Sequence, residues 1–193
     1  MIGLLPSLNR AWRRAPSGYR PGAALDRLAR NLEPYACERL APGLLRLTLP
    51  QGPQIEVSEQ VQGLFMAHIV SHRFRLQGVC AAQPPLTLDV VTGGWLRRCG
   101  VRYLLRQRHA AAQRVLEGLL RYPQIGETLA QLDFRRVRLT VNDGRWQVDI
   151  EHFAASEVVP AGRRYLRLDA EQRRLLLSSL LMIGQLMEKL NHE

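Results

Sequence analysis

The first half of the chain changes from a helical to an alternating pattern of hydrophobic residues. The stretch 23–33 carries leucines at helical spacing and stops at Pro34, a residue that ends helices. Apolar residues then alternate with polar ones over 45–49 and again over 55–57, with a Pro- and Gly-rich break between them. These patterns predict a short helix followed by a β-hairpin at 43–62.

The same two periods recur further along the chain. An alternating run over 64–77 and a shorter one over 86–91 predict two more strands. From about residue 94 the spacing is helical again, and an apolar stripe over 101–120 predicts one helix at about 97–121. Pro123 fits the first turn of a second helix.

A second hairpin is predicted at 135–152 around the two-residue turn Asp143-Gly144, a pair that favours primed hairpin turns. This turn places Val137, Leu139 and Val141 opposite Ile150, Val148 and Trp146 on one face. On the other face it pairs Arg138 with Asp149 and Arg136 with Glu151. Hydrophobic and charge matching therefore agree on one register.

The chain ends with a predicted short strand at 164–168 and a long helix. Asp169 is placed to cap this helix, and Gln172 three residues later completes a near capping box. The apolar residues of the helix, which runs to about Leu190, cover more than one stripe. We therefore expect the helix to be sandwiched within the fold or shared with a second subunit, as a homodimer through this helix.

Together these elements predict an α+β fold in which helices pack on one face of an antiparallel sheet of about five to seven strands. The expected order is one helix, three or four strands, two helices, two or three strands and one helix. Residues 1–20 are predicted to form a basic arm or short amphipathic helix, and residues 21–193 a single domain.

Composition narrows the class of protein. The 193 residues carry three widely spaced cysteines, without metal-binding spacing, which favours a reducing cytoplasm. The apolar start of the chain lacks the order of a secretory signal, and no stretch is apolar enough to predict a transmembrane segment.

The charge is strongly basic, with a formal net charge of +10, and 26 of the 27 Lys and Arg residues are arginine. Two explanations stay open: a genome-wide preference for arginine codons, or selection for contacts with carboxylates or phosphates. The excess is uneven, because residues 93–138 carry ten basic and three acidic groups, a net +7.

This basic segment contains the candidate site. A strand followed by Gly93 and Gly94, with Arg97 and Arg98 in the expected first helical turn, could hold an anion on free backbone N–H groups. Arg102 and Arg106 continue a basic stripe along the same expected helix. A plain turn and a solvated helix face are the alternatives.

Two other chemistries find little support in the sequence. His68 and His72 would share a strand face about 13 Å apart, too far to chelate one metal. There is no nucleophile elbow and no Cys–His pair at diagnostic spacing, so an enzyme is less expected than a binding protein, and neither cofactor nor metal is predicted.

The sequence thus predicts a non-enzymatic cytosolic binding protein of bacterial type that holds an anionic ligand or acidic protein on the arginine-rich helix at 97–121. One alternative is sequence-independent nucleic-acid binding through the same stripe and the basic arm. Another is a small-molecule carrier or enzyme with an apolar pocket between the sheet and the C-terminal helix, lined by Phe74, Trp95 and Tyr165.

Overall fold

The computed structural model describes residues 19–50, 52–64, 67–93, 100–154, 156–159 and 164–192. Within these ranges the chain forms four helices and ten strands. The helices are α2 (Ala23–Leu32), α3 (Ala110–Arg121), α4 (Pro123–Gln131) and α5 (Ala170–His192). The strands are β1 (Ala36–Ala41), β2 (Leu44–Thr48), β3 (Gln54–Leu64), β4 (Ala67–Val79), β5 (Leu86–Thr92), β6 (Val101–Leu105), β7 (Phe134–Asn142), β8 (Arg145–His152), β9 (Ser156–Val159) and β10 (Arg164–Leu166).

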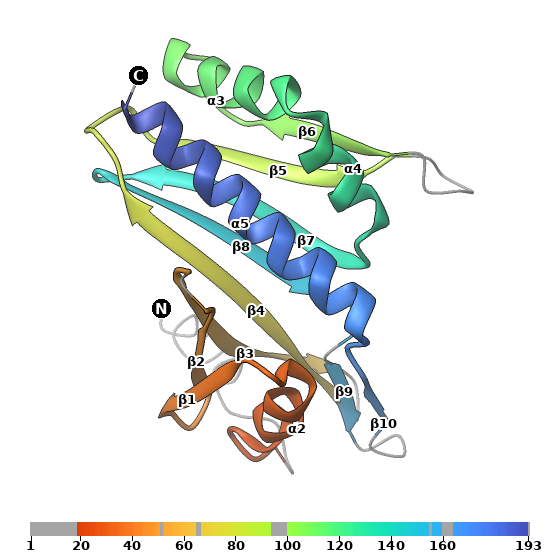
Figure 1. Ribbon diagram of the computed structural model, residues 1–193. Helices are drawn as coiled ribbons and strands as arrows, with labels where there is room; N and C mark the ends of the chain where they lie inside the picture. The colour runs from red at the N-terminus through yellow and green to blue at the C-terminus, as the bar shows by residue number, and fades with distance from the viewer. Residues whose placement is uncertain are drawn as a thin grey trace, which may run out of the picture.

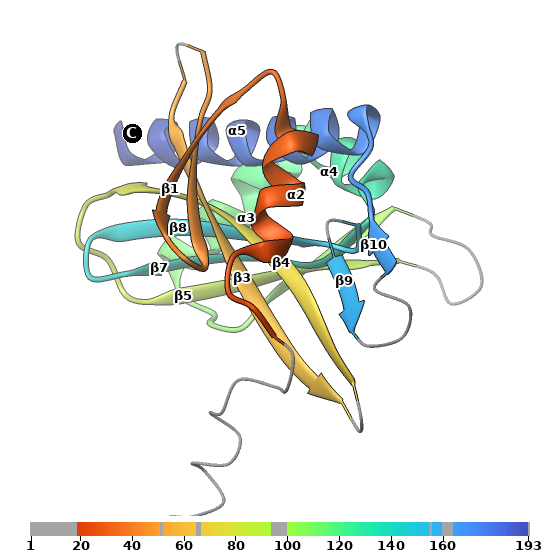
Figure 2. The ribbon, with the colours of Figure 1, turned by 90° about the horizontal axis from the view of Figure 1, so that it is seen from below.

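The ten strands form one antiparallel sheet with the order β1-β2-β3-β4-β8-β7-β5-β6 (Figure 1). β4 is the longest strand, at 13 residues; residues 73–79 pair with β8 and residues 68–70 with β9, which in turn pairs with β10. The helices lie on one side of the sheet, while the far end of the β3–β4 hairpin projects on the other side (Figure 2). The sheet therefore has a helix-covered face and an open face.

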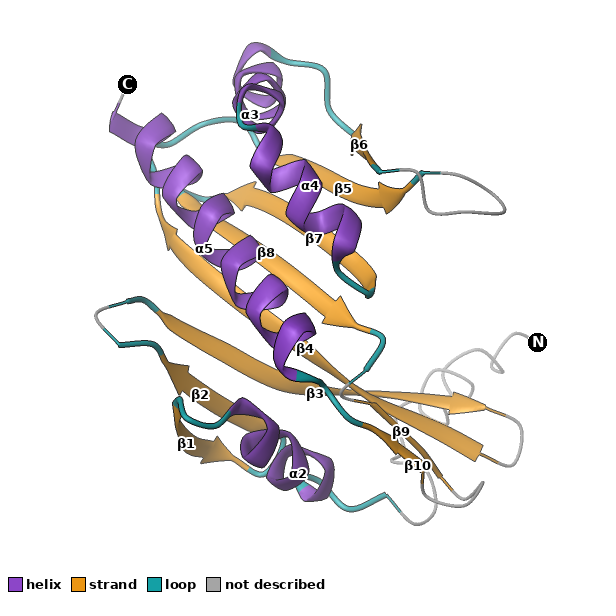
Figure 3. Ribbon diagram, turned by 45° about the vertical axis from the view of Figure 1, so that its right-hand side comes forward, coloured by secondary structure: helices purple, strands orange, loops and turns teal. Residues whose placement is uncertain are grey.

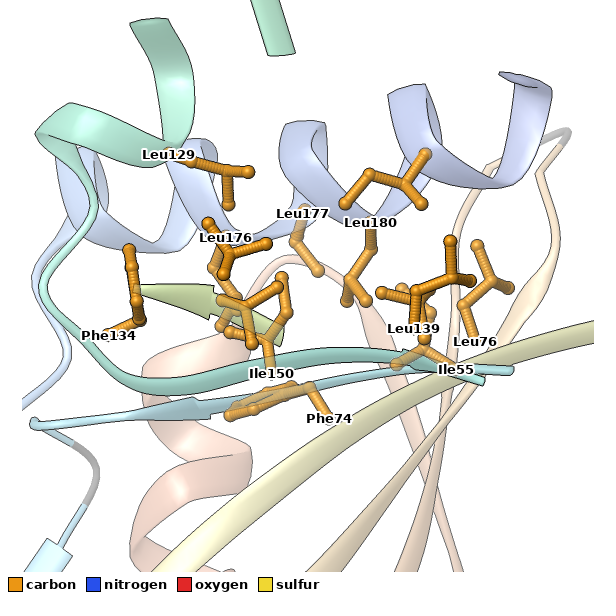
Figure 4. Packing of buried hydrophobic residues seen from close by; sticks show 14 of the residues in the cluster. Ile55, Phe74, Leu76, Leu129, Phe134, Leu139, Ile150, Leu176, Leu177 and Leu180 are labelled. Carbon is orange, nitrogen blue, oxygen red and sulfur yellow. The ribbon is translucent and has the colours of Figure 1, made fainter. Parts of the chain in front are cut away.

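Strand alternation decides which side chains enter the core. Leu139 and Ile150 are at most 2% exposed and point toward α5, where Leu176 and Leu180 cover them (Figure 4). The fully buried Phe74 lies opposite Ile150 in the same cluster. Burying a side chain of this size contributes roughly 1.5–3 kcal/mol. These side chains fill the space between α5 and the sheet, so Phe74 belongs to the core and lines no cavity there.

The wide apolar surface of α5 is explained by its neighbours. The helix packs on β4 and β8 and is flanked by α3 and α4. At its start, Asp169 accepts a hydrogen bond from the Gln172 N–H at 2.8 Å, so the predicted N-cap is confirmed. The Gln172 side chain bonds to the Asp133 N–H instead of returning to Asp169. Of the two explanations offered above, packing within the fold accounts for the apolar width.

At the other end of the sheet, α2 lies across β1 and β2, and β9 and β10 lie beside the far half of β4 (Figure 3). The predicted hairpin at 43–62 is present as β2 and β3, with Leu45 opposite Val57 and Leu47 opposite Ile55. These side chains are buried in the same cluster as the leucines of α2.

The hairpin at 135–152 has the predicted register. β7 and β8 pair Val141 with Trp146 and Val137 with Ile150. Asp143 and Gly144 adopt positive φ angles of 50° and 68°, as a primed turn requires. The local sequence therefore specifies this element completely.

The predicted number of strands is wrong. The sheet has ten strands, not five to seven, because β1, β6 and β9 were not expected. The expected helix at 97–121 is the largest error: residues 101–105 form β6, paired with β5, and α3 begins only at Ala110. Val101, Tyr103 and Leu105 alternate with Arg102 and Leu104, a period of two that the helical interpretation of the same apolar residues overlooked.

Two regions about which the sequence makes predictions lie outside the residues that the structure describes. The predicted arm at 1–20 falls outside it except for Tyr19 and Arg20, and so do Trp95 and the segment 94–99. Among the described helices, none has the length and hydropathy needed to cross a bilayer.

Candidate site on the open face of the sheet

Charged side chains are arranged in rows across the open face of β4, β8, β7, β5 and β6. One row places Arg75, Asp149, Arg138, Asp89 and Leu104 side by side, one residue from each strand. The neighbouring row consists of Arg73, Glu151, Arg136, Val91 and Arg102. Adjacent strands lie about 4.8 Å apart, so neighbours in a row are within reach of each other.

The first row is electrically matched. Arg75 donates to Asp149 at 2.8 Å, and Arg138 donates to Asp89 at 2.6 Å. Arg106, just beyond β6, also donates to Asp89, with Nη2 at 2.8 Å and Nε at 3.0 Å. The hydrogen bond from Arg138, aided by that from Arg106, holds the pKa of Asp89 below its ordinary value despite the opposing effect of burial.

The second row is matched at one end only. Arg73 donates to Glu151 through Nη2 at 3.1 Å and Nε at 3.2 Å. Arg136 and Arg102 are exposed, and their side chains have no ion pair or hydrogen bond among the described residues. Val91 pairs with Arg102 and lies one residue beyond the last β5–β7 pair, Val90–Val137, so it continues this row toward Arg136. Positive charge in excess is therefore localised in this row.

An open groove of about 610 Å³ lies over parts of both rows. It is lined by Glu151, Arg136 and Val91 of the second row and by Arg138, Asp89 and Leu104 of the first, and Arg102 lies next to its edge, paired with Val91. The β3–β4 hairpin forms one side through Gln60, Gln62 and Ser71, and Leu104 marks the other side. Arg135, next to Arg136 at an irregularity in β7, donates to the Gln62 side chain at 2.7 Å across the groove. Because Gln62 is neutral, this contact leaves the charge of Arg135 uncompensated.

The predicted charge pairing within the second hairpin is only half right. Arg138 stands opposite Asp149 and Arg136 opposite Glu151, as the register requires. Both carboxylates, however, bind arginines of β4 on their other side. Arg136 was expected to be neutralised and is not, so it joins the candidate site.

The sequence-predicted site residues are placed differently than expected. Gly93 is buried, and its N–H donates to the Gly100 carbonyl at 2.9 Å, so this N–H is not available to an anion. Gly94, Arg97 and Arg98 lie outside the described residues. Among the described residues no helix follows this glycine pair; the chain continues into β6.

Arg102 and Arg106 lie on or beside β6 and face the groove side of the sheet, not along a helix. His109 is the N-cap of α3: its Nδ1 accepts from the Ala112 N–H at 3.2 Å. A side chain of the protein itself therefore already binds a backbone N–H at the start of α3. Arg102 and Arg106 are retained in the candidate site, on a strand instead of a helix.

His68 and His72 lie in the interior of the fold. They are 2% and 0% exposed, and no group of metal-ligating side chains is found in the described ranges. His72 Nε2 lies 4.0 Å from Glu59 Oε1, and Glu59 also accepts from Tyr19 Oη at 2.6 Å and the Gly22 N–H at 2.9 Å. This buried carboxylate fastens the start of α2 to β3.

The fold and the groove define the chain as an α+β protein with an antiparallel sheet whose open face is basic. It belongs to the family described as protein of unknown function (DUF3156), whose model matches residues 30–187 and so includes every residue of the groove. No curated protein and no solved structure matches the chain.

Proposed function

We propose that this chain is a non-enzymatic binding protein that holds an acidic partner in the groove on the open face of its sheet. The observation that carries the proposal is the unmatched pair Arg102 and Arg136 beside the apolar Val91 and Leu104. Asp149 and Glu151 are engaged by β4, so these two arginines keep donors directed at solvent. Guanidinium groups bind carboxylates with two parallel hydrogen bonds.

A protein partner fits the groove better than a nucleic acid. Single-stranded nucleic acids bind sheet faces through aromatic side chains on which bases stack. The described lining of the groove contains Val61, Val91 and Leu104 and no aromatic residue.

The proposal retains two further predictions from the sequence. A cytosolic location agrees with the free thiols of Cys37 and Cys80. A homodimer through α5 remains a prediction; it is tested by sedimentation of the protein at several concentrations. The carrier alternative, with a pocket between α5 and the sheet, has no support where side chains fill that space.

The test uses a fluorescently labelled oligo-glutamate peptide and the double variant Arg102→Gln, Arg136→Gln. We expect its affinity, measured by fluorescence anisotropy at low salt, to fall about tenfold, because two charged donors each contribute on the order of 1 kcal/mol or less at an exposed site. The control is Arg114→Gln, Arg121→Gln, which removes the same charge from exposed positions of α3 on the helix-covered side.

An equal loss in both double variants would mean that net charge alone attracts the peptide, and the proposal would fail. Tighter binding of an oligo-thymidine of equal charge, with a steep dependence on salt, would instead favour the nucleic-acid alternative.

A further inference from the structure

β6 is an edge strand whose outer backbone groups have no partner. It pairs with β5 alone. Two hydrogen bonds fix the alternation of its backbone: Gly93 N–H donates to Gly100 O at 2.9 Å, and Arg106 N–H donates to Thr87 O at 3.0 Å. Residues 100, 102, 104 and 106 therefore direct their N–H and C=O groups toward β5.

The intervening residues Val101, Tyr103 and Leu105 consequently direct theirs outward. Within the described part of the chain, these outward groups have no hydrogen-bond partner. An edge of this kind is a template for another strand. It lies directly beside the row that carries the unmatched arginines.

The side chains along this edge specify a partner. On the open face, Arg102, Leu104 and Arg106 follow one another at every second residue, and Leu104 is 48% exposed. These are the positions at which an added antiparallel strand would be non-hydrogen-bonded and its side chains closest, with Cα atoms about 4.5 Å apart. Opposite charges at such positions stabilise the pair.

We infer that the acidic partner of the proposed function binds as an additional strand on β6, with the pattern acidic–x–apolar–x–acidic. Its carboxylates face Arg106 and Arg102, and its apolar side chain covers Leu104. The pattern is symmetric, so it fits either strand direction. This inference rests on the proposed function and adds the backbone geometry and the sequence pattern of the ligand.

A second copy of the chain fits this edge poorly in the register centred on Leu104. An antiparallel β6–β6 pair centred on Leu104 would place Arg102 of each copy opposite Arg106 of the other, and like charges directly opposite are destabilising. Charged side chains of this kind commonly keep sheet edges from self-association. They attract an acidic strand for the same reason.

The experiment uses a labelled, blocked peptide with the core Glu-Thr-Leu-Thr-Glu and two versions methylated on backbone nitrogens. In an antiparallel strand the threonine N–H groups point at β6 and the leucine N–H points away. We expect methylation of both threonines to lower the affinity at least about tenfold, because two backbone bonds are lost. Methylation of the leucine should change it less than about threefold. The reverse ranking would indicate a parallel added strand, which also supports the inference.

Three outcomes would overturn strand addition. Equal effects of the two methylation patterns would show that the backbone of β6 takes no part. A dimer that the peptide dissociates would assign the edge to a second copy. Binding of the oligo-thymidine in competition with the peptide, at comparable affinity, would assign it to nucleic acid.

A failure of strand addition can be distinguished from a failure of the proposed function. If the unmethylated peptide binds, and binds less to Arg102→Gln, Arg136→Gln, the proposed function holds even when methylation has no effect. If neither this peptide nor oligo-glutamate binds, the proposed function itself fails. As a test within the chain, Leu104→Glu should abolish the advantage of the alternating peptide over oligo-glutamate, while Leu104→Val should retain it.

Discussion

On its helix-covered face, β8 presents Trp146, Val148 and Ile150, each at most 1% exposed, to the buried core that includes the leucines of α5. On its open face, the same strand presents Asp149 and Glu151, which bind arginines of β4. On the covered face, side chains stabilise the fold by filling the space between the sheet and the helices, and any apolar residue of suitable size contributes. On the open face, arginines and acidic residues form ion pairs, so an arginine that lacks an acidic partner of its own keeps an uncompensated charge.

This difference explains where function is expected. Close packing uses every side chain of the covered face to stabilise the fold, so that face has nothing left for a partner. The open face contributes less to stability because its ion pairs are partly solvated. Its row of Arg136 and Arg102 is accordingly free to serve binding. Substitutions on the two faces should therefore separate stability from affinity.

The largest expected effect is that of Trp146→Ala on the covered face. The indole ring occupies space left by two glycines: a Cβ on Gly78 would lie 2.6 Å from Trp146 Cε2, and one on Gly184 would lie 3.3 Å from Cη2. Removing the ring leaves a cavity that the backbone cannot fill, so we expect a loss of about 3–5 kcal/mol in the free energy of unfolding. Urea unfolding followed by far-ultraviolet circular dichroism measures it.

The matched control on the open face is Leu104→Ala. Because Leu104 is 48% exposed, its truncation should change the free energy of unfolding by less than about 0.5 kcal/mol. Similar losses in the two variants would contradict the contrast between the faces.

The sequence predicts the covered face well and the edges of the sheet poorly. Hairpins announced by turn residues, such as Asp143-Gly144, are found with their register. β1 is almost wholly exposed and has no apolar alternation, and β9 has only four residues, so neither carries a pattern. β6 carries one, but five residues fit both periods, and only its pairing with β5 decides.

The sequence predicted only part of the site, and the reason is related. Charge composition pointed to Arg102 and Arg106, although on a helix. Arg136 was assigned to Glu151 because a hairpin shows only one neighbour of each strand. The interior strand β8 has a second neighbour, β4, and Arg73, 78 residues away, takes that carboxylate. Such nonlocal competition is not encoded in local spacing.

A smaller effect is expected from His152→Ala, at the end of the covered face. His152 is 1% exposed; its Nδ1 accepts from the Ala154 N–H at 2.9 Å, so Nε2 carries the proton and donates to Gln172 at 2.9 Å. Losing both bonds and the ring should cost about 2 kcal/mol in the free energy of unfolding.

The same residue makes the free energy of unfolding depend on pH. Burial lowers the pKa of His152 below its ordinary 6.5, opposed in part by Gln172 and by the nearby Asp133 and Asp169. The unfolded chain then binds the proton first, so stability is complete above pH 6.5 and falls as the pH drops toward the folded pKa. Urea unfolding at pH 7.5 and 5.5 should show a smaller decrease in His152→Ala than in the parent; an unchanged decrease would exclude His152 as its source.

A smaller loss of stability than that of His152→Ala is expected from Asp89→Asn, at the matched row of the open face. Asparagine keeps the shape but removes the charge that Arg138 and Arg106 share, and the partly exposed site limits the loss to about 1 kcal/mol in the free energy of unfolding. The low pKa of Asp89 means that its contribution is present above its ordinary pKa of 3.8 and is lost as the pH falls through the lower folded value.

The affinity for an acidic peptide should rise in the same variant. Asp89→Asn releases Arg138, which lines the groove beside Arg136, and also releases Arg106 just beyond β6, so oligo-glutamate should bind about threefold more tightly, as expected for one partly exposed charge. Asp143→Asn provides the control, since it removes the same charge at an exposed turn outside the groove. An equal gain in both variants would assign the effect to net charge, whereas a gain in Asp89→Asn alone would show that the matched row limits what the unmatched row can bind.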